Sequence, residues 1–151
     1  MALLLEQFLP YRFNRMAEIL SKNASQTYKS EYGLTRPEWR AFALLGQYGT
    51  MTATEISYYS TMHKTKVSRA IFTLEEKRWI VRGQDEKDRR IEKINLTSLG
   101  KQAYDRLVPL MLKVETDVIA RLGEANSKAL EQGLDALEAL FLDPGESRKT
   151  G

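Results

Sequence analysis

The spacing of apolar side chains predicts a mainly helical protein. Apolar residues recur every three or four positions, the repeat that places side chains on one face of a helix. This repeat predicts six helices, close to residues 6–28, 35–46, 52–59, 64–78, 97–122 and 127–142. Pro10 fits a first helical turn better than a helix interior, which gives an alternative start for the first helix at that residue. Between the fourth and fifth helices the repeat changes to two, which is typical of strands and predicts a hairpin over residues 80–96.

Polar residues at the ends of these stretches support the predicted boundaries. Thr35 with Glu38, and Thr52 with Glu55, have the spacing of a capping box, in which two side chains satisfy free N–H groups of a first helical turn. Pro109 lies inside the fifth helix, where its ring removes one backbone hydrogen bond. We therefore expect a kink at that position.

The order of these elements indicates a fold class. Three helices followed by a hairpin with a charged tip is the order of a winged helix-turn-helix, whose third helix enters the DNA major groove. The expected architecture is mainly α with a small β-hairpin: a winged helix-turn-helix over residues 33–99, with helices in residues 1–32 and 100–143 forming a dimerisation region. Residues 144–151 are expected to form a flexible tail.

Composition excludes several kinds of function. The chain has no cysteine and one histidine, His63, so thiol chemistry is excluded and a Ser-His-Asp triad would depend on that histidine. The sequence has no phosphate-binding glycine loop. We therefore expect neither an enzyme nor a bound metal or cofactor. No apolar run has the length of a membrane helix or a signal peptide, which favours a cytoplasmic protein without a membrane partner.

Positive charge is concentrated in one segment. The net charge of the whole chain is +3, but residues 61–101 contain 11 Lys and Arg against 6 Asp and Glu. A local excess of positive charge attracts polyanions such as nucleic acid. A solvated charged face would have the same composition.

The start of the helix predicted over residues 64–78 carries groups suited to DNA contact. With Val67 facing inward, basic and polar side chains remain at the N-terminal end, where the helix dipole also favours an anion. These candidates are Lys64, Thr65, Lys66, Ser68 and Arg69. The alternative is a solvated helix face, but the neighbouring hairpin adds four basic residues: Arg82, Lys87, Arg89 and Arg90.

Segments in and beside the hairpin resemble the MarR family of winged helix-turn-helix regulators. The resemblance rests on the run 74–82, on Asp88 and Arg90, and on Leu96, Thr97 and Gly100 that follow. The long terminal helices are similar as well, so the resemblance covers nearly the whole chain. It implies a homodimeric, sequence-specific DNA-binding protein.

The resemblance also implies roles for residues of the hairpin. In the family, the arginine matching Arg90 enters the minor groove, the aspartate matching Asp88 helps to orient it, and Arg89 would lie near phosphate. Asp88 taken alone would equally fit a simple turn residue. The chain differs at Trp79, which stands where the family often has a glycine that ends the recognition helix in a left-handed conformation. We therefore expect a different helix exit here.

Apolar residues near both ends of the chain need a surface to cover them. They include Leu3, Leu4, Leu5, Phe8, Leu9, Leu137, Leu140, Phe141 and Leu142. Exposed apolar patches mark interfaces. A two-fold dimer built from the terminal helices would place two recognition helices about 34 Å apart on a pseudo-palindromic operator. The alternative is that the apolar stripes pack on one another within one chain.

Members of the family often respond to small aromatic or anionic ligands. Arg12 and Arg15 lie three residues apart on the first predicted helix and could pair with a carboxylate, and Trp39 could supply an aromatic wall. The alternative is that the two arginines form a solvated face and that Trp39 lies in the core.

The sequence thus predicts a dimeric transcriptional regulator, a ligand-responsive repressor. Its expected partners are double-stranded DNA, a second copy of the chain and a small aromatic or anionic effector. The alternative function is a winged-helix module that binds another protein through the same surface, without specific DNA binding.

Overall fold

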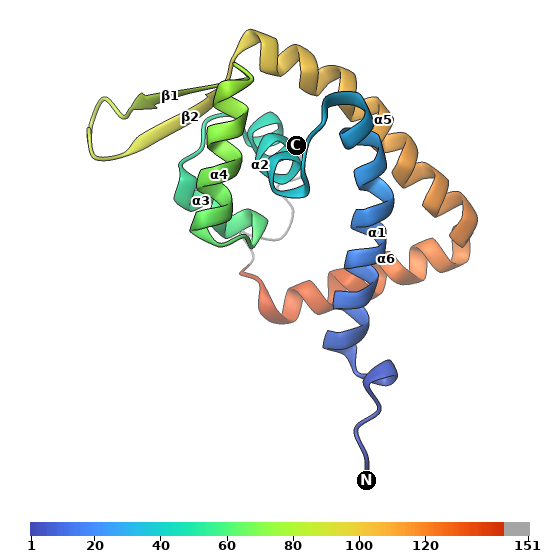
Figure 1. The fold of residues 1–151 in the computed structure, drawn as a ribbon. Helices are drawn as coiled ribbons and strands as arrows, with labels where there is room; N and C mark the ends of the chain where they lie inside the picture. Colours follow the sequence, from blue (N-terminus) through green and yellow to red (C-terminus); the bar gives the residue numbers. More distant parts are fainter. Residues whose placement is uncertain (144–151) are drawn as a thin grey trace. The chain divides into compact units, whose positions relative to one another are not determined.

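The computed structural model describes residues 1–143 (Figure 1). The predicted tail over residues 144–151 lies outside this range. The helices are η1 (Leu5–Gln7, a 3-10 turn), α1 (Leu9–Tyr32), α2 (Arg36–Tyr48), α3 (Ala53–Ser60), α4 (Lys64–Glu76), α5 (Ser98–Leu122) and α6 (Glu124–Phe141), and the strands are β1 (Ile80–Gln84) and β2 (Glu92–Leu96). The chain forms two compact units, residues 1–111 and a second unit that begins at Leu112. The predicted class, mainly helical with a small hairpin, is confirmed.

Side-chain caps fix the starts of α2 and α3 as the sequence predicted. The Thr35 hydroxyl accepts a hydrogen bond from the Glu38 backbone N–H at 3.5 Å, and the Glu38 carboxylate accepts one from the Thr35 N–H at 2.9 Å. At α3 the Thr52 hydroxyl accepts from the Glu55 N–H at 3.1 Å. These contacts satisfy N–H groups that have no partner inside the helix.

The two terminal helices differ in how well their starts were predicted. The first starts at Leu9, beside the alternative start at Pro10, with that proline in its first turn, where a missing N–H costs nothing. The last starts at Glu124, three residues earlier than predicted, because Gly123 (φ +88°) both breaks the chain after α5 and directly precedes the next helix. The helix α5 continues through Pro109 from Ser98 to Leu122.

The core of the first unit lies among α2, α3, α4, the base of the hairpin and the first half of α5. Its centre is aromatic: the Phe42 ring lies 4.9 Å from the ring of Trp79 and 5.7 Å from that of Tyr104, measured between centroids. Ile56, Ile71, Leu74, Ile94 and Leu107 fill the space around them and are fully buried. Burial of these apolar side chains holds the three helices at fixed angles.

The hairpin is attached to this core at its base. Its strands pair antiparallel with Arg82 opposite Ile94, and Ile94 also pairs with Met51, in the segment before α3. The Met51 N–H donates to the Ile94 carbonyl at 3.0 Å, and the Ile94 N–H donates to the Met51 carbonyl at 2.8 Å. The hairpin then extends away from α2, α3 and α4 (Figure 1).

The exit of α4 corrects the expectation about Trp79. The left-handed residue is Arg78 (φ +61°), one position earlier, and Trp79 is buried. The Trp79 N–H donates to the Leu74 carbonyl at 3.0 Å and the Arg78 N–H to the Glu75 carbonyl at 2.8 Å, which is the Schellman pattern of a helix end. The chain therefore keeps a left-handed exit without a glycine, because core packing holds Trp79 in place.

Glycine is required instead at the start of α5. A Cβ atom on Gly100 would lie 2.0 Å from the backbone oxygen of Trp79. Thr97 joins the same two segments: its hydroxyl donates to the Arg78 carbonyl at 2.7 Å and accepts from the Gly100 N–H at 3.0 Å. The close approach of α5 to the exit of α4 explains why Thr97 and Gly100 occur together.

Within residues 1–143, the helices lack the combination of length and apolar composition that crossing a membrane requires.

Candidate nucleic-acid interface

The helix α4 buries one face and leaves the predicted DNA-contacting residues on the other. Val67, Ala70, Ile71 and Leu74 lie in the core. The exposed residues at its N-terminal end are Lys64, Thr65, Lys66, Ser68 and Arg69. The sequence-predicted candidates therefore lie together in two turns of one helix, free of the core.

His63 caps the N-terminus of this helix. Its Nδ1 atom accepts a hydrogen bond from the Thr65 N–H at 3.3 Å, and its carbonyl accepts from Val67 at 3.1 Å. The first turn of α4 has no acidic residue. The positive end of the helix dipole is therefore left without a carboxylate, as a helix that meets phosphate requires.

The turn between α3 and α4 is fixed by serines that the sequence reading did not single out. The Ser57 hydroxyl donates to the Met62 carbonyl at 2.6 Å, and the Ser60 hydroxyl accepts from the Met62 N–H at 3.2 Å. Thr61 takes a left-handed conformation (φ +58°) between them. The pattern Ser-x-x-Ser before a short break could have indicated this turn, since serine hydroxyls often bond nearby backbone.

At the tip of the hairpin, Asp88 holds Arg90 through three hydrogen bonds. One carboxylate oxygen accepts from the Arg90 backbone N–H and from Nε, each at 3.1 Å, and the other accepts from a terminal guanidinium nitrogen at 3.2 Å. These bonds, the side-chain ones first, hold the pKa of Asp88 below its usual range. The Arg90 side chain is 91 % exposed, so it is oriented by Asp88 and still accessible. Arg89 beside it is exposed as well.

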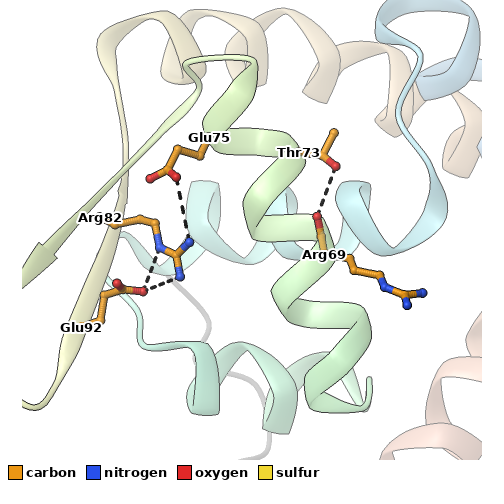
Figure 2. Close-up of polar contacts among 5 residues, drawn as sticks. All are labelled: Arg69, Thr73, Glu75, Arg82 and Glu92. Atoms are coloured by element: carbon orange, nitrogen blue, oxygen red, sulfur yellow. Dashed lines mark hydrogen bonds and ion pairs between the residues drawn. The ribbon is translucent and has the colours of Figure 1, made fainter.

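Arg82 differs from the other basic residues of the hairpin. Its Nε donates to a Glu92 carboxylate oxygen at 2.9 Å, and a terminal nitrogen lies 2.8 Å from the same oxygen. Its other terminal nitrogen lies 4.0 Å from a carboxylate oxygen of Glu75 on α4. Figure 2 shows Arg82 between these two carboxylates, with Arg69 on another side of α4 and pointing away from them. From the sequence, Arg82 counted simply as one of the four basic residues in or beside the hairpin.

The residues suggested for an effector are placed separately. Trp39 stacks on Tyr28, with ring centroids 5.5 Å apart, and is half-buried. A cavity of about 310 Å³ beside it is lined by Trp39, Arg40, Ala43, Leu44, Gln47, Tyr59 and Ser60, and does not include Arg12 or Arg15. Those two arginines lie on the exposed first turns of α1.

A second cavity, of about 420 Å³, lies between α1 and the start of α2. It is lined by Glu18, Ile19, Ser21, Lys22, Ser25, Lys29 and Arg36. One terminal nitrogen of Arg36 lies 2.7 Å from a Glu18 oxygen, while its Nε atom is buried without a hydrogen-bond partner. Burial, and then the charge of Arg36, lower the pKa of the neighbouring Arg40 guanidinium. Lys22 and Lys29 lie seven residues apart on one face of α1, and this spacing is the sequence signal that could have found their side of the site, while Arg36 comes from α2.

Across the described part of the chain, no three His, Asp or Glu side chains are grouped so that they could hold a metal ion.

The fold and this surface define a class of protein. A winged helix-turn-helix with a basic start to its third helix and an exposed arginine on its wing is a DNA-binding module.

Comparisons with known proteins identify the family. The sequence profile of the MarR family matches residues 34–91. The chain is 30 % identical over 121 residues to the uncharacterized HTH-type transcriptional regulator YwoH of Bacillus subtilis (strain 168), covering 80 % of this chain and 87 % of that protein. The chain belongs to the MarR family of helix-turn-helix transcriptional regulators, and is a DNA-binding regulator instead of an enzyme.

Solved structures share the fold at lower identity. Sco3205, a MarR family regulator of Streptomyces coelicolor in complex with DNA, matches with a TM-score of 0.78 and 19 % identity, covering 96 % of this chain and 93 % of that chain. BpsR of Bordetella bronchiseptica, whose DNA binding is regulated by 6-hydroxynicotinic acid, matches with a TM-score of 0.77 and 17 % identity, covering 91 % and 98 %. The likeness extends beyond the winged helix-turn-helix.

Proposed function

We propose that this protein is a dimeric, sequence-specific transcriptional repressor that binds a pseudo-palindromic operator and is released by a small ligand. The observation that carries the proposal is the pair of exposed elements on one unit: the basic start of α4 and the Arg90 side chain oriented by Asp88. Such a protein acts on the genome and would work in the cytoplasm.

The two elements are suited to different parts of a duplex. The major groove is about 12 Å wide and admits one helix, so α4 would place Thr65, Ser68 and Arg69 near base edges, with Lys64 and Lys66 toward phosphates. The wing would bring Arg90 to the adjacent minor groove and Arg89 to the backbone. Asp88 lowers the entropy that Arg90 would lose on binding, because its guanidinium is already held.

The terminal helices supply the dimer in this proposal. Along α1, one stripe of apolar side chains at helical spacing is exposed: Leu9, Phe13, Met16 and Leu20. In α6 and just after it, Leu140, Phe141 and Leu142 are exposed too. A second copy of the chain would remove these surfaces from water, which is the usual meaning of a large exposed apolar patch. Two-fold symmetry then gives two half-sites about 34 Å apart.

The test is binding to the DNA that flanks its own gene. At about 150 mM salt, the protein should bind this fragment more tightly than a shuffled duplex of the same length. The substitution Arg90→Ala should weaken specific binding by about 1–3 kcal/mol, while Arg106→Ala, which removes an equal charge from α5, should leave the preference intact. Binding no tighter than to the shuffled duplex would disprove the proposal.

The alternative function, a winged-helix module that binds another protein, gives a different result in the same assay. Charge reversal at Arg89 and Arg90 would then leave DNA affinity unchanged and abolish capture of the protein partner. The proposed repressor loses DNA affinity instead.

For the ligand, the cavity between α1 and α2 is the best-supported site. Three basic side chains, Lys22, Lys29 and Arg36, line it against the single carboxylate of Glu18, and the buried Arg36 Nε atom lacks an acceptor. A small anion would supply that acceptor and lower the repulsion between Arg36 and Arg40. We expect benzoate or inorganic phosphate to raise the melting temperature of the protein, and Arg36→Gln to abolish the shift. An equal shift in both proteins would place the anion elsewhere.

A further inference from the structure

Arg82 links three elements at the base of the wing. It lies on β1, bonds Glu92 on β2 at 2.9 Å, and reaches Glu75 on the last full turn of α4 at 4.0 Å (Figure 2). Its side chain is 34 % exposed, against 91 % for Arg90. One guanidinium faces two carboxylates, one on β2 and one on α4, so its positive charge is neutralised where it lies. A group held in this way is poorly placed to bind phosphate.

The outer part of the hairpin needs a contact that fixes it relative to α4, as the contact of Arg82 with Glu75 does. The base is held by the pairing of Ile94 with Met51, but a two-stranded hairpin on its own is only marginally stable in water. Each residue beyond Arg82 carries the chain about 3.3 Å farther from that anchor. A small rotation at the base therefore becomes a larger displacement at Arg90, near the tip.

We propose that Arg82, with Glu92 and Glu75, is a positioning residue that sets the angle of the wing relative to α4 and thereby selects DNA sequence without touching DNA. The inference rests on the proposed DNA-binding function. It assigns opposite roles to two wing arginines: Arg90 meets the duplex, and Arg82 determines where Arg90 is.

Neutralising Glu92 distinguishes an effect of wing position on DNA binding from a simple effect of charge. The substitution Glu92→Gln adds one positive charge, so a mere charge effect would strengthen binding to any duplex. If Arg82 positions the wing, the ratio of affinities for the gene-flanking fragment and the shuffled duplex falls instead, by about two- to fivefold, the range that an exposed ionic link can produce. The matched control is Glu86→Gln, with the same charge change at an exposed position in the same hairpin. It should leave the ratio unchanged.

The double variant Arg82→Met, Glu92→Gln keeps the net charge of the native chain. Because Arg82→Met also removes the contact with Glu75, this variant should lower the ratio at least as far as Glu92→Gln alone. The slope of log affinity against log salt should stay that of the native protein. A slope smaller by about one would show that Arg82 binds phosphate and would overturn the proposal.

Wing position can also be measured without DNA. The chain has no cysteine, so spin labels can be placed on Lys87→Cys at the wing tip and Gln47→Cys on α2. The distance distribution by pulsed electron spin resonance should broaden with Glu92→Gln and not with Glu86→Gln. An unchanged distribution would refute the positioning role. If the native protein does not prefer the gene-flanking fragment, the proposed function is disproved. The distance measurement then still tests whether Arg82 positions the wing.

Discussion

Asp88 fixes the position of Arg90, which lies two residues later in the same turn. Two of its bonds go to the guanidinium and one to the backbone N–H of the same residue, so a single carboxylate fixes both the turn and the side chain. Only the ionised carboxylate accepts all three bonds. The lowered pKa of Asp88 therefore determines the pH range over which the carboxylate stays ionised and keeps its bonds to Arg90.

The pH dependence of this contact follows from the direction of the shift. A carboxyl group whose pKa is lower in the folded state stabilises that state above its unfolded pKa of about 3.9, and this contribution is lost as pH falls through the lowered value. We expect no change in the Asp88–Arg90 pair between pH 8 and pH 5. The Cγ resonance of Asp88 should titrate below the usual range, and Arg90→Gln should move its midpoint upward. A midpoint unaffected by Arg90→Gln would contradict the assignment.

The end of α4 is the element that joins the recognition helix to the wing. Arg78 occupies a left-handed conformation that costs a non-glycine residue about 1–2 kcal/mol. The position is held by the Schellman bonds and by Thr97, whose hydroxyl donates to the Arg78 carbonyl. Burial of Trp79 and Ile80, which follow directly in the core, offsets the cost of this left-handed conformation.

Replacing Arg78 by glycine should therefore stabilise the protein. We expect the free energy of unfolding to rise by about 0.5–1 kcal/mol, the relieved strain less the added freedom of the unfolded chain. Urea unfolding followed by circular dichroism measures it. The matched control is Glu76→Gly, two residues earlier within α4, which should cost about 1 kcal/mol. A loss of stability in both variants would show that the Arg78 side chain contributes more than its strained backbone costs.

The proposed dimer depends on apolar surface that one chain leaves exposed. All residues from 1 to 20 are exposed, including the stripe of Leu9, Phe13, Met16 and Leu20 on α1. A charge placed in the stripe would have to be buried without a partner. Phe13→Glu should raise the dimer dissociation constant by at least about tenfold in sedimentation equilibrium. Asn14→Glu, the next residue and off the stripe, should not. Equal behaviour of both variants would exclude α1 from the interface.

Local patterns predicted much of the molecule. The capping residues Thr35 and Thr52, the hairpin and the inward face of α4 are short-range features, in which neighbouring residues determine the outcome. The bond from Arg90 to Asp88 is also a contact within one turn, but it was expected from the resemblance to the MarR family, because Asp88 alone fits a simple turn residue equally well. The start of α6 was missed by three residues because Gly123 serves both as the end of one helix and as the cap of the next.

Contacts between distant segments could not be predicted in this way. Arg82 counts as one more basic residue in the sequence, and only the approach of β1 to α4 places it beside Glu75, seven residues away on another element. The same holds for Arg36 and Glu18, which come from two helices joined by a turn.

The sequence by itself determined the elements, their order and the charged side chains available for binding, because helix periodicity, caps and turns are set by residues within a few positions of one another. The tertiary structure decided which charges stay exposed and which pair with residues of another element. Arg90 is exposed and oriented, while Arg82 is neutralised and Arg36 is turned into a cavity. Electrostatic interactions depend on distance in space, and packing of the core sets that distance.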